Sequence, residues 1–75
     1  MRKNIAAERR EVMASTGPEG MGFKRFDRVK SPGGESYIFI GIRDGEAYVE
    51  RCDGKDPLFR KVDAFDFQYW KVERP

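Results

Sequence analysis

The sequence predicts an all-β domain, built as a small barrel of five short strands, that follows a flexible or weakly helical N-terminal arm. The dipeptide Asp44-Gly45 joins two runs of β-branched and aromatic residues, which is the pattern of a hairpin with a two-residue type I′ turn. Turn-forming residues recur at short intervals after Phe23, and all ten aromatic residues lie between Phe23 and Trp70. We therefore place the barrel domain in residues 22–75. The barrel is expected to be closed, because closure removes the exposed strand edges that favour aggregation.

The arm is expected to span residues 1–21. Asn4 is a suitable N-cap, and Ile5, Val12 and Met13 recur near helical spacing, so residues 5–14 are predicted to form a short helix. A helix of this length is marginal alone in water, and the glycine- and proline-containing tract that follows is a linker. We expect the arm to be mobile unless it docks on the domain or on a partner.

The domain is predicted to begin with a strand at residues 23–30, in which Val29 points inward. The loop at residues 31–34 contains two glycines, which allow positive φ. The hairpin then supplies the second and third strands. A turn at residues 52–57 leads into a fourth strand at residues 58–62.

The chain is then expected to form one helical turn at residues 63–66 before its last strand. Asp63 can cap this turn, and Phe65 is expected to plug the end of the barrel. Residues 68–73 are predicted to form the fifth strand, with Trp70 pointing inward.

The hairpin turn also predicts a strand register. With Arg43 opposite Glu46, Ile40 lies opposite Val49 and Phe39 lies opposite Glu50. One face of the second strand is then made of isoleucines, which are expected to fill the barrel. The other face gathers aromatic residues: Tyr37, Phe39 and Tyr48.

This aromatic face predicts the candidate protein-interaction site, because an antiparallel sheet usually exposes one of its faces to water. The site residues are Tyr37, Phe39 and Tyr48. Three explanations remain open at this stage. The face is covered by the arm or by barrel curvature, or it is a contact in a homo-oligomer, or it binds a partner protein or nucleic acid.

A second candidate surface is the basic first strand. Four cationic residues surround the single acid Asp27, and they are the alternative site, for nucleic acid: Lys24, Arg25, Arg28 and Lys30. The net charge of +2 describes a mixed surface and favours protein interaction over nucleic-acid binding.

No catalytic or metal-binding pattern is present in the sequence. The chain has one cysteine, Cys52, and lacks the histidine that would activate it or complete a Cys/His metal cluster. Five aspartates lie in predicted turns, where they are expected for local hydrogen bonds: Asp44, Asp53, Asp56, Asp63 and Asp66. We therefore expect no enzyme activity, no cofactor and no metal.

The single cysteine and the lack of a long apolar run predict a cytoplasmic protein without a membrane partner. We expect it to act in a bacterial or phage-type cytoplasm.

The chain from Phe26 to Val72 resembles the SH3-like small-barrel superfold. The resemblance lies in the "Phe-Asp-Arg-Val-Lys" first strand, the apolar "Ile-Phe-Ile-Gly-Ile" strand and the "Val-Asp-Ala-Phe-Asp-Phe" turn before the last strand. This superfold includes translation factors, chromatin readers, peptide binders and an oligomeric enzyme, so the resemblance implies a fold more than a function.

Among these proteins the chain is similar in length and layout to the type II dihydrofolate reductases, which share the Gly-Met-Gly at 20–22 and the Asp-Arg-Val at 27–29. Their Val-Gln-Ile-Tyr motif is replaced by Pro-Leu-Phe-Arg at 57–60, so no catalytic residue is transferred. The predicted function is a non-enzymatic binding module, an adaptor or regulator that acts through protein interaction or self-association. The alternative is a nucleic-acid-binding barrel.

Overall fold

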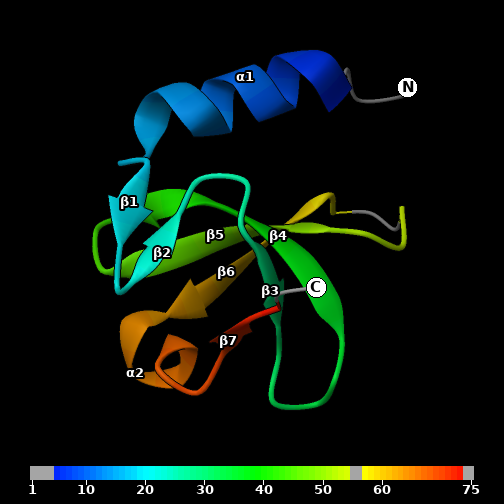
Figure 1. Cartoon of the computed structure of the whole chain (residues 1–75). Coiled ribbons are helices and arrows are strands. Elements are labelled where there is room, and N and C mark those ends of the chain that lie inside the picture. The colour runs from blue at the N-terminus through cyan, green and yellow to red at the C-terminus, as the bar shows by residue number, and fades with distance from the viewer. Residues whose placement is uncertain (1–4, 55–56, 74–75) are drawn as a thin grey trace.

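The computed structural model describes residues 5–54 and 57–73 (Figure 1). In chain order the elements are α1 (Ile5–Ser15), β1 (Glu19–Gly20), β2 (Phe23–Lys24), β3 (Arg28–Lys30), β4 (Ser36–Arg43), β5 (Glu46–Arg51), β6 (Phe59–Asp63), α2 (Ala64–Phe67) and β7 (Lys71–Val72).

The main sheet has five antiparallel strands in the order β6-β5-β4-β3-β7. The prediction of a β-rich domain with a five-stranded sheet is confirmed. Strand β4 is the longest and lies in the centre, and α2 connects the edge strand β6 to the other edge strand β7. Strands β1 and β2 form a separate two-stranded hairpin within the segment that was expected to be linker and first strand.

The predicted type I′ turn is present between β4 and β5. Asp44 and Gly45 both have positive φ, at 51° and 75°, as this turn requires. Next to the turn the register is also the predicted one, with Arg43 opposite Glu46 and Gly41 opposite Tyr48.

Beyond Gly41 the predicted register is wrong. A β-bulge inserts Ile40 as an extra residue, so that Phe39 lies opposite Val49 and Ile38 lies opposite Glu50. A shift of one residue exchanges the two faces of a strand. Tyr37 and Phe39 therefore point into the core, with exposed fractions of 4% and 0%, and the expectation that they lie on the outer face is wrong.

The core lies on the inner face of the sheet, and α2 closes it at one end. Its side chains come from nearly every element of the domain: Phe23, Val29, Tyr37, Phe39, Ala47, Val49, Val62, Phe67 and Trp70. Three aromatic rings pack around Phe67, with centroid distances of 4.8 Å to Phe23, 5.7 Å to Phe39 and 5.3 Å to Trp70. Phe67 is therefore the buried plug, and the expectation that Phe65 fills this place is wrong, since Phe65 is 68% exposed.

A second, smaller apolar cluster lies on the outer face, beneath α1 (Figure 1). Val12 and Met13 of the helix pack against Ile40, Tyr48 and Phe59 of the sheet. The helix predicted for residues 5–14 is confirmed as α1. In this structure α1 is docked on the sheet and covers Ile40, the residue whose side chain the bulge turns to the outer face.

Candidate functional site

The three aromatic residues predicted as an interaction site do not form one surface. Tyr37 and Phe39 are core residues on the inner face, whereas Tyr48 is buried on the outer face beneath α1. The Tyr48 hydroxyl accepts a hydrogen bond from Nη2 of Arg43, whose guanidinium lies 5.1 Å from the ring centroid. All three rings are thus used within the chain.

Arg25, one of the four predicted nucleic-acid residues, has its guanidinium turned into the protein. Nε donates to the carbonyl oxygen of Ile40 at 2.7 Å. Nη2 lies 2.8 Å from the carbonyl oxygen of Met13 and 3.0 Å from both Oγ1 and the carbonyl oxygen of Thr16. Because these donors are already used at the C-terminal end of α1, Arg25 is a structural residue rather than a phosphate contact.

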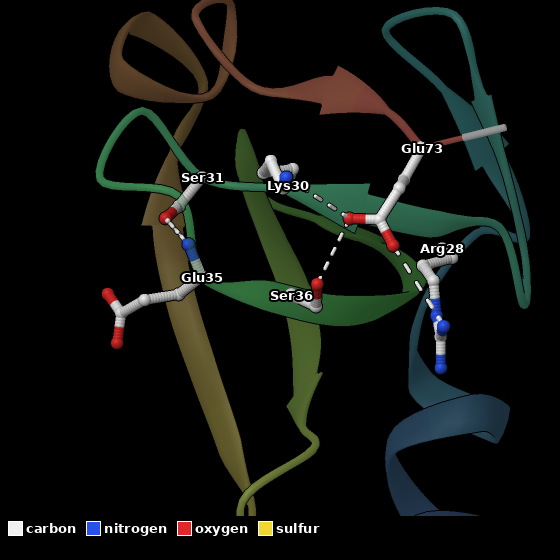
Figure 2. Close-up of polar contacts among 6 residues, drawn as sticks. All are labelled: Arg28, Lys30, Ser31, Glu35, Ser36 and Glu73. Carbon is white, nitrogen blue, oxygen red and sulfur yellow. Dashed lines mark hydrogen bonds and ion pairs between the residues drawn. The ribbon is translucent and has the colours of Figure 1, made fainter.

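The other predicted cations are exposed. Arg28 and Lys30 project from β3, and each lies 3.9 Å from the Glu73 carboxylate, as Figure 2 shows. The same carboxylate accepts a 3.0 Å hydrogen bond from the Ser36 hydroxyl. One carboxylate therefore forms long ion pairs with two cations. Such ion pairs contribute little when the side chains are this exposed.

Lys71 adds a cation that the sequence did not suggest. The register of β3 and β7 places Lys71 directly opposite Lys30, on the face away from the Val29 and Val72 pair. Like charges directly opposite each other in a sheet are destabilising. We call Arg28, Lys30 and Lys71 the basic face. Lys71 was missed because its position opposite Lys30 depends on the pairing of β3 with the edge strand β7, which follows about forty residues later in the chain.

A pair of exposed aromatic rings lies at α2. Phe65 and Tyr69 are 68% and 58% exposed, and their rings meet edge to face with centroids 6.4 Å apart. The local sequence holds them there, because the Asp63 carboxylate caps α2 by accepting from the Phe65 N–H at 3.0 Å. The side-chain amide of Gln68 donates to the Phe65 carbonyl oxygen at 2.7 Å. With Phe67 turned inward as the plug, Phe65 and Tyr69 must face water.

Tyr69 also lines a groove of about 390 Å³ between the β3–β4 loop and the β6–α2 segment. Its base is Trp70, which is 6% exposed. The Arg60 guanidinium lies 5.8 Å from the Trp70 ring centroid, and it donates a 3.2 Å hydrogen bond to the Tyr37 hydroxyl. We call this site, together with the adjoining Phe65 ring, the aromatic groove.

The loop wall of the aromatic groove is fixed by short hydrogen bonds. The Ser31 side-chain oxygen accepts from the Glu35 N–H at 3.1 Å (Figure 2). The Ser31 N–H donates to the Glu35 carbonyl oxygen at 2.8 Å. Ser31 is itself buried. The groove thus has a preformed wall, and its rim contains both signs of charge, from Glu35, Lys61, Asp63 and Asp66.

Sequence reasoning missed the aromatic groove, although one local signal was present. Phe65 and Tyr69 are four residues apart, and that spacing places side chains next to each other on a helical turn. The prediction assigned Phe65 to the core, so the four-residue spacing to Tyr69 was not read as an exposed aromatic pair.

Cys52 and the acidic side chains are the remaining groups considered for catalysis or metal binding. Cys52 is exposed in a turn, and in residues 5–54 and 57–73 no three Cys, Asp or Glu side chains are placed to hold a metal ion. The hydrogen bond from Arg51 to Asp53 raises the pKa of Arg51 above its ordinary value, which only keeps that guanidinium charged. Neither of the two described helices has the length and apolar character needed to cross a membrane.

Comparison of the chain with protein-family models, with curated proteins and with solved structures finds no match.

Proposed function

We propose that this chain is a non-enzymatic binding module that accepts a segment of a partner protein in the aromatic groove. The observation that supports this most is the exposed edge-to-face pair of Phe65 and Tyr69 beside a groove whose base is Trp70. Exposed aromatic area next to a groove marks an interaction site, since it is costly to leave in water.

The composition of the groove supports the same proposal. Tyr, Trp and Arg are the residues most enriched in binding hot spots, and the groove presents Tyr69, Trp70 and Arg60 together. The rim has both signs of charge, which suits a peptide with mixed charges better than a polyanion. The Ser31–Glu35 loop wall is already ordered, so binding costs less conformational entropy there.

We also propose that the five-stranded sheet curls into an SH3-like small barrel. The proposal is supported by the strand order β6-β5-β4-β3-β7, with the long β4 in the centre, and by the single helical turn α2 before the last strand. In such a barrel α2 would bridge the two sheet edges and keep Phe65 and Tyr69 at the rim of the groove.

The experiment that tests the groove is selection of short random peptides displayed on phage against the full chain. We expect enriched peptides whose affinity falls by about tenfold or more in Tyr69→Ala, because truncation of a central aromatic residue usually removes a hot spot. Phe26→Ala is the matched control, since Phe26 is 61% exposed but lies outside the groove. Enrichment that Tyr69→Ala leaves unchanged would contradict the proposal.

The alternative is that a second copy of this chain occupies the aromatic groove. Sedimentation velocity distinguishes self-association from peptide binding, because self-association raises the apparent molar mass as the protein concentration increases. Phe65→Glu should abolish this increase, because it brings a charge to a symmetric interface.

A further inference from the structure

Phe26 has a backbone conformation that is unusual for a bulky residue. Its φ is 76°, in the left-handed region that favours glycine. The Phe26 N–H donates to the carbonyl oxygen of Phe39 at 2.7 Å, and the Phe39 N–H donates to the carbonyl oxygen of Asp27 at 2.8 Å. Two residues thus lie opposite one, which is a β-bulge whose first residue is usually glycine.

Burial of the Phe26 side chain does not offset the free-energy cost of this backbone conformation. Its ring is 61% exposed, so a glycine would remove both the backbone strain and the exposed apolar area. The neighbouring residues hold the bulge in place, because Arg25 is fixed by four hydrogen bonds and the Asp27 carboxylate accepts from the Lys24 N–H. A strained residue with an exposed aromatic ring is the pattern expected of a ligand contact.

The basic face begins two residues further along the chain, at the first residue of β3. Arg28 and Lys30 share one carboxylate, that of Glu73 (Figure 2). Lys71 lies opposite Lys30 and adds a third cation, so this face keeps a net positive charge. The opposition of Lys30 and Lys71 is unfavourable in the free protein. A bound polyanion would remove this repulsion, since each phosphate can lie between or beside the ammonium groups.

We infer that Phe26 and the basic face form a binding site for single-stranded nucleic acid. Phe26 stacks on a base, and Arg28, Lys30 and Lys71 contact the phosphates. A single strand is required because the base faces of a duplex are already stacked, whereas an unpaired base can lie on an exposed ring. An acidic peptide would satisfy the charges but would give the planar Phe26 ring no aromatic partner.

This site shares no residue with the aromatic groove and does not depend on the function proposed for it. It also changes the residue set expected from the sequence. Arg25 is excluded, Lys24 is not part of the basic face, and Lys71 and Phe26 are added.

The test is fluorescence anisotropy of a labelled oligothymidylate with the full chain over a range of salt concentrations. Three phosphate contacts predict a slope of log K against log salt of about −2 for a single strand. Lys71→Gln should reduce the size of this slope by about 0.7, and Arg10→Gln, an exposed cation on α1, should leave it unchanged.

Phe26→Gly tests the stacking step. Glycine suits the positive φ, so the variant should melt at the same or a higher temperature, while its affinity for the oligonucleotide falls roughly tenfold. The wild-type protein should also bind an abasic oligonucleotide of the same length about as weakly as the variant binds the normal one.

Three results would overturn the inference. These are no binding at low salt, equal affinity for the normal and the abasic oligonucleotide, and a Phe26→Gly variant that binds as tightly as the wild type. Equal affinity for polyglutamate would assign the face to acidic proteins instead.

Discussion

The Nε of Arg25 donates a 2.7 Å hydrogen bond to the carbonyl oxygen of Ile40. Ile40 is the extra residue of the bulge in β4, so its carbonyl oxygen lies where the regular pairing of the strand is interrupted. The same guanidinium bonds to Met13 and Thr16 at the end of α1. One side chain therefore joins the bulge, the helix and the segment that follows the helix.

Replacement of Arg25 tests this role. Arg25→Met keeps the aliphatic length but leaves the carbonyl oxygens of Ile40, Met13 and Thr16 without their donor. Hydrogen bonds from a charged group contribute about 1.5–3 kcal/mol, so we expect a loss of roughly 2–3 kcal/mol in the free energy of unfolding, measured in urea. Lys24→Met is the control, since Lys24 is exposed, and it should change the free energy by less than about 0.5 kcal/mol. A similar small change for Arg25→Met would contradict the role.

The sequence predicted the hairpin turn and the residues next to it because that information is local. The Asp44-Gly45 pair determines the turn type wherever it occurs between two strands. The bulge at Ile40 depends instead on Arg25 and on α1, which are distant in sequence, and pattern reasoning over one strand does not contain them. Because a bulge exchanges faces, this single missed residue reversed the assignment of Tyr37 and Phe39.

The basic face was also predictable only in part. Arg28 and Lys30 were correctly expected at the surface, since alternation along a short strand places them opposite the buried Val29. Arg25 looked the same in the sequence, and only the fold shows that backbone carbonyl oxygens surround it. Whether any of these cations binds nucleic acid stays a prediction.

Gly41 provides a test of how α1 is attached. A Cβ added at Gly41 would lie 2.4 Å from Oγ1 of Thr16 and 2.6 Å from the carbonyl oxygen of Gly17. Gly41→Ala should therefore push this segment from β4, with a loss of about 1–3 kcal/mol in the free energy of unfolding and faster proteolysis near Thr16. Gly33→Ala is the matched control, because its Cβ would meet nothing closer than 3.8 Å. Equal behaviour of the two variants would show that Thr16 does not pack on Gly41.

Glutamate should have opposite effects at two phenylalanines, the buried Phe39 of β4 and the exposed Phe65 of α2. Phe39→Glu should unfold the protein, because it places an unpaired carboxylate in a fully buried site. Phe65→Glu should leave the protein folded, since Phe65 is mostly exposed. Circular dichroism and thermal melting of the two variants provide the measurement. A folded Phe39→Glu variant would restore the register that the sequence suggested.

Removal of the arm is the last test. The sequence predicts an arm that is mobile unless it docks, and a mobile arm could be removed without a change in melting temperature. In the structure, deletion of α1 uncovers Ile40, Tyr48 and Phe59 and removes the ion pair between Arg9 and Glu50 at 2.6 Å.

Burial of one apolar side chain contributes about 1.5–3 kcal/mol, and Val12 and Met13 are only half-buried, so a chain that begins at Thr16 should lose roughly 2–3 kcal/mol. It should also bind a hydrophobic dye such as ANS, because the outer apolar cluster becomes accessible. The double variant Val12→Ser with Met13→Ser should reproduce most of this loss in the full-length chain. An unchanged melting temperature in both would mean that α1 does not stabilise the sheet and that the outer cluster is stable without its cover.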